Sequence, residues 1–359
     1  MPGRGVDQTL PHPADPRLRE AHVRDARYYV ETAEAVNGQI PRPVSFSWPW
    51  GSALRTLEDV APDVRVINLE STITRRDTFA TGKAVHYRMS PANVPSLTAG
   101  RPDVCVLANN HVLDFGHPGL EDTFDALSAA GLRWAGAGRD AAEAARPTVV
   151  SVGADRRVVV CAYGTASSGI PSGWAATLDG PGVNFLPELS DTTADSVIDH
   201  LGTAVRPGDI AVVSIHWGSN WGYQVPRDHV RFAHRLIDAG VDVVHGHSSH
   251  HPRPIEVYRD KLILYGCGDF IDDYEGIRGF EKYRDDLRLL YFATVEPDNG
   301  ALTHLRMAPV QARRMRLSPA ASCDSRWLAD VLARISRPLG TRVDLEPEGT
   351  LVIRRGGTE

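Results

Sequence analysis

The amino-acid sequence predicts an α/β fold in which one layered domain makes up most of the chain. Short apolar runs, which are typical of buried strands, alternate with segments whose apolar residues recur at helical spacing. This alternation continues through Gly268 and favours a sheet covered by helices. After Asp273, apolar runs are separated by turn residues such as Pro297-Asp298-Asn299-Gly300, which indicates antiparallel strands.

The expected elements follow from these periods and from the Gly and Pro residues between them. A first helix is expected at residues 17–36, before Asn37-Gly38, and an aromatic, proline-containing loop at residues 40–50. The expected later helices are residues 91–99, 118–130, 191–205, 226–239 and 327–335. The expected strands are residues 64–69, 103–107, 157–163, 209–215, 241–244, 261–265, 287–295, 302–307 and 313–317, with a hairpin at 341–354.

This order divides the chain into three parts. Residues 1–57 hold the N-terminal helix and the aromatic loop, and residues 58–318 form the main domain. Residues 319–359 are expected as a C-terminal helix and hairpin packed on that domain.

Composition and charge disfavour several classes of protein. The chain is 42% hydrophobic and 23% charged, as globular domains are, and its net charge of −6 without a basic stretch disfavours a nucleic-acid partner. No apolar run is long enough for a membrane helix, and the N-terminus lacks the apolar region of a signal peptide, so we expect a cytoplasmic protein. The four cysteines form no C-x-x-C pair, which argues against a thiolate zinc site.

Histidines are concentrated after one predicted strand. His245, His247, His250 and His251 follow the apolar run 241–244, although the whole chain has only 14 histidines. Neutral imidazole is the commonest metal ligand, so several rings at one strand end suggest a metal site. The alternative is a histidine-rich surface loop without a ligand.

Other predicted strands also end in residues that can bind metal ions. These residues are Glu70, Asn110 with His111, His216, and His247 with His250. Each has an ordinary explanation alone, such as a solvated carboxylate or a helix cap. Parallel strands, however, place their carboxyl ends at one edge of a sheet, where oxygen and imidazole ligands together suit Zn, Mn or Fe.

These motifs resemble the capsule-synthesis (CapA-type, poly-γ-glutamate) family. The resemblance covers residues 58–273, with the motifs in the family's order. The matching motifs are Asn68-Leu69-Glu70, Ala108-Asn109-Asn110-His111 with Asp114-Phe115-Gly116, Gly136-Ala137-Gly138, Ile215-His216-Trp217-Gly218, Gly246-His247-x-x-His250 with Pro254-Ile255-Glu256, and Leu264-Tyr265-Gly266-Cys267-Gly268-Asp269-Phe270. In the last motif, Asp269 stands where the family usually has asparagine.

The resemblance implies a fold, a cofactor and residue roles. The family belongs to the calcineurin-like metallophosphoesterase superfamily, whose fold is a four-layer α/β/β/α sandwich around two divalent transition-metal ions (Mn, Zn or Fe). Two such ions can generate hydroxide near neutral pH and stabilise the attacking and leaving oxygens of an ester. By position, Glu70 would bridge the metals, while Asn110, His216, His247 and His250 would be ligands. His111 would hydrogen-bond to the leaving oxygen or protonate it, and Asp114 would orient His111.

The sequence departs from the family's pattern at its beginning. The family's first strand normally ends in Gly-Asp, and this aspartate is a ligand of the first metal. The sequence given starts at Met1-Pro2-Gly3-Arg4, which resembles the end of that element. Either the natural chain starts earlier, which we favour, or this protein has lost one ligand and with it one metal.

Further residues carry weaker expectations. Ser168, Trp217 and Arg253 are candidates for contacts with an anionic small-molecule or polymer substrate, whereas the acidic residues Asp272, Asp273 and Glu275 are expected to form a solvated face. The function that the sequence favours is hydrolysis of an ester linked to capsule-like polymer metabolism. One alternative is a non-catalytic component of polymer assembly that keeps the fold. A second is a sugar- or peptide-binding module that uses tryptophans, and the oligomeric state is not readable from the sequence.

Overall fold

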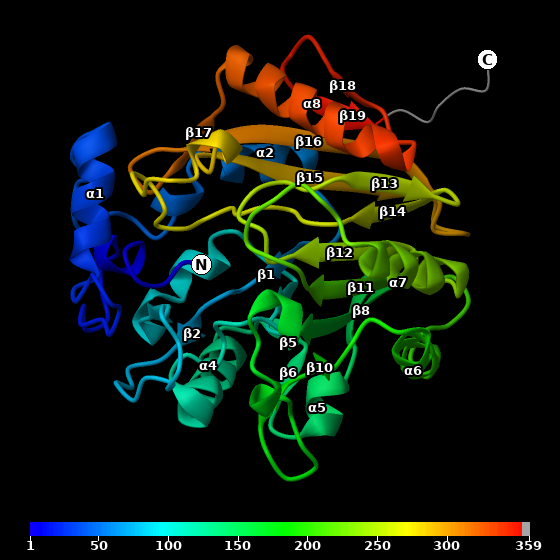
Figure 1. Cartoon of the computed structure of the whole chain (residues 1–359), viewed down its shortest axis with the longest axis horizontal. Coiled ribbons are helices and arrows are strands. Elements are labelled where there is room, and N and C mark those ends of the chain that lie inside the picture. Colours follow the sequence, from blue (N-terminus) through cyan, green and yellow to red (C-terminus); the bar gives the residue numbers. More distant parts are fainter. Residues whose placement is uncertain (354–359) are drawn as a thin grey trace.

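The computed structural model describes residues 1–353 and shows an α/β arrangement built around several sheets (Figure 1). The largest sheet has seven strands in the order β10-β8-β11-β12-β14-β13, with β7 paired to β8. Its strands are β7 (Thr148–Val152), β8 (Arg156–Thr165), β10 (Phe185–Leu186), β11 (Ile210–His216), β12 (Val243–His247), β13 (Ile255–Tyr258) and β14 (Lys261–Leu264). The strands from β10 to β14 pair in parallel, whereas β7 and β13 are antiparallel to their neighbours.

A second sheet faces the first. It contains β1 (Val66–Asn68), β4 (Val104–Val106) and β5 (Arg133–Ala135) in parallel. Because side chains alternate along a strand, Val104 and Val106 of β4 pack with Val160 and Val212 of the large sheet, while Cys105 points to the opposite side. A shared apolar core therefore holds the two sheets together.

Helices cover the outer faces of both sheets. Leu120, Phe124 and Leu127 of α4 (Gly116–Ala129) and Leu97 of α3 (Pro95–Thr98) pack on the side of β4 that faces away from the large sheet. The helices α6 (Asp191–Gly202) and α7 (Arg227–Asp238) bury their apolar sides against β8, β11 and β12, beside which they lie in Figure 1. Both predicted helices therefore form close to their expected residues.

The C-terminal part forms a third, antiparallel sheet, as the change of pattern after Asp273 predicts. Its strands are β15 (Leu287–Val295), β16 (Leu302–Ala312), β17 (Leu317–Pro319), β18 (Val343–Leu345) and β19 (Leu351–Ile353), in the order β15-β16-β19-β18 with β17 beside β16. The helix α8 (Ser322–Ser336) covers this sheet, and the same apolar core includes residues of β13 and β14 (Figure 1). The expected hairpin at 341–354 forms within the described residues, and residue 354 lies outside them.

The remaining elements are short and connect these layers. The helices are α1 (Arg27–Asn37), α2 (Ala53–Val60) and α5 (Ala141–Ala145), and the paired two-residue strands are β2 (Thr72–Ile73) with β3 (Arg88–Met89) and β6 (Ala137–Gly138) with β9 (Gly182–Val183). The 3-10 turns are η1 (Asp7–Thr9), η2 (Trp48–Trp50), η3 (Pro91–Asn93), η4 (Ala166–Ser168), η5 (Ser172–Trp174), η6 (Glu281–Tyr283) and η7 (Arg337–Leu339). No helix within residues 1–353 has the length and apolar character needed to span a bilayer.

Three local expectations are wrong. The strand expected at residues 313–317 begins only at Leu317, as β17, because Arg313 and Arg316 close a turn through hydrogen bonds between their backbones. The helix expected from residue 17 begins only at Arg27, because Arg17 forms a bridge with Asp25 and the segment between them turns back on itself. The acidic residues 272, 273 and 275 are buried rather than solvated. Asp272 pairs with Arg288, Asp273 pairs with Arg4, and the Glu275 carboxylate accepts hydrogen bonds from two backbone amides.

Candidate metal centre

The candidate ligands of β11 and β12 lie on one face of the large sheet. In the parallel pairing of these strands, Ser214 is opposite His245 and His216 is opposite His247. Alternation turns all four side chains away from α6 and α7 and toward the second sheet. His245 and His247 therefore lie within the strand, two residues apart, and not in the loop after it as expected from the sequence.

Three strand ends meet at the His216 ring. Its Nδ1 lies 2.7 Å from Nδ1 of His247, and its Nε2 lies 3.2 Å from Oδ1 of Asn110 and 3.8 Å from Oε1 of Glu70. Glu70 follows β1 and Asn110 follows β4, so four of the predicted ligands come together from both sheets. His216 is fully buried, and Glu70 and His247 are nearly so.

His250 follows β12 and lies near enough to Glu70 and His216 for its charge to act on both, but its own hydrogen bonds go to other residues. Its Nδ1 lies 2.9 Å from the Asp269 carboxylate, and its Nε2 lies 3.3 Å from the Tyr274 hydroxyl. Burial opposes protonation of His250, but the charge and hydrogen bond of Asp269, together with the charges of Glu70 and Asp272, outweigh burial and raise its pKa. Carboxylates that accept a hydrogen bond from one imidazole nitrogen commonly orient the other nitrogen toward a metal. Asp269 occupies that position, although the sequence alone suggested no role for it.

The predicted pair His111 and Asp114 is in contact, with Nδ1 2.7 Å from Oδ2. Burial lowers the pKa of His111 to about 4, although the charge of Asp114 opposes this effect. Lys83, from the loop between β2 and β3, lies 2.6 Å from the Asp114 carboxylate and also contacts the Asn110 carbonyl oxygen. The sequence analysis missed Lys83, although lysine is rare in this chain and the other two, Lys261 and Lys282, lie outside the candidate centre.

A second layer of hydrogen bonds fixes the candidate ligands. The Ser214 hydroxyl lies 3.0 Å from Nε2 of His247 and 2.9 Å from Nδ1 of His245. Asn68 donates a hydrogen bond to the Glu70 carboxylate at 2.9 Å, and the Asn109 side chain donates to Asn68 in turn. These contacts restrict the orientation of His247 and Glu70.

The weaker candidates lie beside the centre and do not point into it. The Ser168 hydroxyl donates to the His216 carbonyl oxygen at 2.9 Å, and Trp217 is buried with its indole nitrogen donating to Tyr265. Arg253 is also buried and donates to the carbonyl oxygen of Ser219 at 2.7 Å. Each of the three therefore has an internal partner that holds the loops around the histidines.

The donor set fits a transition metal in its chemistry. Burial lowers the pKa of His216 and of His247 well below the usual histidine value, so both rings are uncharged at neutral pH and keep a lone pair for a metal. Imidazole, carboxylate and amide oxygen are all ligands of Zn, Mn and Fe. Within residues 1–353, however, no group of three or more His, Cys, Asp or Glu side chains is arranged closely enough to hold an ion.

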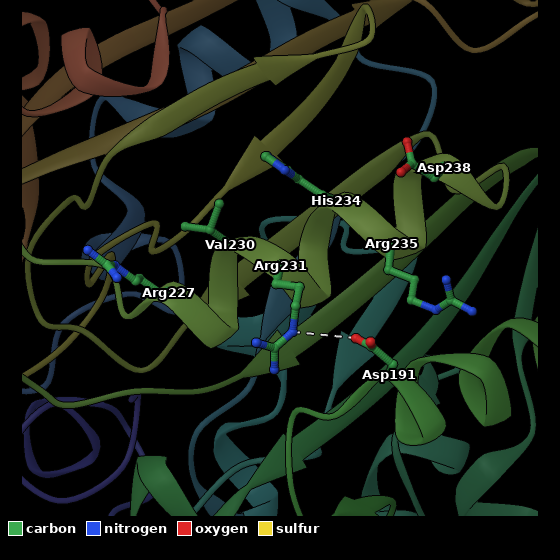
Figure 2. Close-up of a pocket in the computed structure, with 7 residues that line it drawn as sticks. All are labelled: Asp191, Arg227, Val230, Arg231, His234, Arg235 and Asp238. Carbon is green, nitrogen blue, oxygen red and sulfur yellow. Dashed lines mark ion pairs between the residues drawn. The ribbon is translucent and has the colours of Figure 1, made fainter.

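The groove in Figure 2 lies elsewhere, on the outer side of α7. Arg227, Arg231 and Arg235 extend along the helix there, and Arg231 lies 3.4 Å from Asp191 of α6. Arg235 pairs with Asp195 at 2.5 Å. Because Asp191 and Asp195 offset these charges and the predicted ligands lie beyond the sheet, we assign no chemistry to this groove.

Because two buried histidines are uncharged in the folded chain, we expect the free energy of unfolding to fall on acidification. Burial lowers the pKa of His229, which stacks on Trp217, and of His245 to about 4 each. Between this value and the usual value of about 6.5, the unfolded chain binds more protons than the folded chain, so stability decreases as pH falls through that window. Each such histidine contributes up to about 1.4 kcal/mol per pH unit.

We expect His229→Phe, which keeps an aromatic ring on Trp217, to make urea-unfolding stability less steep between pH 6.5 and pH 4. The decrease in slope should approach about 1.4 kcal/mol per pH unit. The exposed His22→Phe variant is the control, and its slope should equal that of the natural chain. Equal slopes for all three proteins would contradict the assignment of His229 as a buried neutral group.

The fold and the site together define an α/β protein in which histidine, carboxylate and amide side chains meet at the carboxyl ends of parallel strands. The chain belongs to the family of bacterial capsule synthesis proteins described as PGA_cap, which matches residues 1–274. This match confirms the resemblance seen in the sequence motifs.

Individual relatives agree with this family. The chain is 55% identical over 354 residues to a probable polyglutamine synthesis accessory protein of Mycobacterium tuberculosis, with 98% of this chain and 93% of the relative covered. It is 31% identical over 234 residues to the PGA biosynthesis protein CapA of Bacillus subtilis, with 64% and 58% covered. A capsule biosynthesis protein CapA of Bacillus anthracis is 27% identical over 244 residues, with 67% and 55% covered.

Proposed function

We propose that this protein is a metal-dependent hydrolase of the phosphoesterase type that acts in the biosynthesis of a capsule-like glutamate polymer. The observation that carries the proposal is the meeting of Asn110, Glu70 and His247 at the His216 ring, from strands of two sheets. The polymer link is supported by relatives whose names refer to polyglutamine, PGA and capsule synthesis. The substrate would accordingly be an anionic small molecule or polymer.

The proposed fold type is the four-layer α/β/β/α sandwich of metallo-dependent phosphatases. Supporting it are the apolar core between the two parallel sheets and the helices on their outer faces. In such a fold the carboxyl ends of strands from both sheets lie at a common edge, which is where the candidate ligands are.

Glu70, Asn110, His216, His247 and His250 would hold one or two divalent ions, which supply a hydroxide near neutral pH when bound. Asp269 would orient His250, and Ser214 would orient His247. His111 turns Nδ1 toward Asp114, which leaves Nε2 as the nitrogen that would take up a proton and pass it to the leaving oxygen. The Asp114 carboxylate is fully buried, and Lys83 offsets its charge.

The second candidate is a non-catalytic component of polymer synthesis that keeps this fold. It is favoured by the word "accessory" in the name of the Mycobacterium tuberculosis relative and by the spacing of the His, Asp and Glu side chains within residues 1–353. Under this alternative, His111→Ala would leave polymer production in cells intact, because only the proposed reaction requires the ring.

We expect the purified full-length protein to bind about one or two transition-metal ions per chain and to hydrolyse bis-(p-nitrophenyl) phosphate. Elemental analysis and initial rates measure these properties, and a chelator should remove both. His216→Ala should lower the metal content, whereas His304→Ala, in β16 of the C-terminal sheet, should not. A protein that contains no transition metal after incubation with Mn, Zn or Fe would contradict the proposal.

A further inference from the structure

Half-buried aromatic side chains form a continuous surface beside His250. We call Trp221, Tyr223, Phe280 and Tyr283 the aromatic rim. Trp221 stacks on Phe280 with ring centroids 3.9 Å apart, Tyr223 meets Tyr283 edge-on at 5.2 Å, and the Trp221 and Tyr283 rings are 5.3 Å apart. Trp221 also lies 5.3 Å from the His250 ring, so the rim reaches the candidate metal centre.

The loop that carries Trp221 is bonded to the loop that carries His250. The His250 amide donates to the Asn220 carbonyl oxygen at 2.9 Å, and the Gly222 amide donates to Nε2 of His251 at 3.0 Å. Arg253 connects the same loops through Ser219. The position of the rim is therefore fixed relative to the centre.

Positive charges flank the rim. Lys282 lies 4.8 Å from the Tyr283 ring centroid and Arg334 lies 5.5 Å from that of Tyr223, and both are exposed. Within residues 1–353 no carboxylate oxygen lies within 4.0 Å of Lys282, Arg334 or the buried Arg253. The neighbouring Glu281 instead accepts a hydrogen bond from the Gly279 amide. The rim therefore carries two exposed cations without an ion-pair partner within residues 1–353, beside the exposed Glu281 carboxylate, on a chain whose net charge is −6.

We infer that the aromatic rim, with Lys282 and Arg334, is the docking surface through which an anionic polymer bearing carboxylates reaches the metal centre. This inference rests on the polymer link in the proposed function. The two exposed cations would pair with carboxylates, and the ring edges would pack against the methylene groups between them.

The ring arrangement favours a carboxylate polymer over a nucleic acid. Recognition of single-stranded nucleic acids depends on bases that stack on free aromatic faces. Here Trp221 and Phe280 stack on each other with planes 5° apart, and Tyr283 stacks on His251 at 8°. The faces within these stacks are occupied, while pairing with carboxylates requires only the flanking charges.

The test measures binding of labelled γ-linked polyglutamate to the full-length protein by fluorescence anisotropy at low ionic strength. We expect the double variant Lys282→Gln/Arg334→Gln to bind about tenfold more weakly, because it removes two exposed ion pairs. The control is Arg55→Gln/Arg101→Gln, which removes the same charge from side chains that are 88% and 65% exposed elsewhere. Thermal melts of both double variants should match the natural chain.

Each outcome separates this inference from the proposed hydrolysis. Polymer binding by a protein that takes up no transition metal on incubation with Mn, Zn or Fe would overturn the hydrolase and leave the docking surface standing. A metal-loaded protein that does not bind the polymer, or whose binding survives the Lys282/Arg334 change, would overturn the docking surface alone. Equal loss in the control variant, or displacement by polythymidylate at matched charge, would show binding of polyanions in general and would also overturn it.

Discussion

Replacing Asp273 with alanine is expected to lower the free energy of unfolding by about 3 kcal/mol, because the buried Arg4 loses one of its two carboxylate partners and keeps only Glu20, at 2.9 Å. The Asp273 carboxylate accepts hydrogen bonds from Arg4 at 2.8 and 2.6 Å and from the Gly5 amide at 2.7 Å. Arg4 is 3% exposed, and its guanidinium lies over the rings of Tyr29 and Tyr87 at 3.6 and 4.4 Å. Water cannot easily replace the lost carboxylate in this position.

Urea unfolding at neutral pH measures this loss. The exposed pair of Asp15 with Arg17 provides the control, and Asp15→Ala should cost less than about 1 kcal/mol. The triple variant Arg4→Met/Glu20→Gln/Asp273→Ala should recover part of the stability, since it removes the buried cation together with both of its carboxylate partners. A loss no larger for Asp273→Ala than for Asp15→Ala would show that Arg4 is solvated and the pair unimportant.

This cluster also shows where sequence reasoning reaches its limit. The Asp273 carboxylate lies in a run of acidic residues, and local composition does not distinguish a solvated acidic face from buried acids with distant partners. Arg4 and Asp273 are 269 residues apart in the sequence. Only the folded chain brings them together.

The longer parallel strands, in contrast, were predictable from local pattern, whereas the short parallel strands β5 and β10 were missed. The apolar runs at 157–163 and 209–215 lie within β8 and overlap β11, since a fully buried strand consists almost wholly of apolar residues. The antiparallel strands β7 and β13 were missed. Both are rich in β-branched residues, reading Thr-Val-Val-Ser-Val and Ile-Glu-Val-Tyr, so their composition was a usable sign of strands.

For the candidate centre, the residues at strand ends were predictable, as the longer strands were. Residues at the ends of strands were identified because parallel strands end at one edge, and the structure brings Glu70, Asn110, His216 and His247 into contact. Residues that reach the centre from loops had no such signal. Lys83 is the clearest example, although its rarity in an arginine-rich chain was a usable sign.

Replacing His111 with glutamine is expected to lower kcat on bis-(p-nitrophenyl) phosphate by about 10²–10⁴-fold, with little change in KM. The ring is held by Asp114 at 2.7 Å, and Asp114 is held in turn by Lys83 at 2.6 Å. Glutamine fills a similar volume but cannot accept and return a proton at that position. Because His111 is not among the expected ligands, the metal content should remain that of the natural chain.

Two control variants make this result specific. His117→Gln changes an exposed histidine on α4, six residues along the chain, and should keep full activity. Lys83→Met should lower kcat less than His111→Gln does, because it removes the contacts of Lys83 with Asp114, at 2.6 Å, and with Nδ1 of His111, at 3.2 Å, but leaves the His111 ring in place. Lys261→Met removes another lysine that is paired with an aspartate, at 16% exposure against 12% for Lys83, and should have no effect. If His111→Gln kept its kcat while His216→Ala lost both metal and activity, the reaction would proceed without the His111 ring, and the contacts around it would have only a structural role.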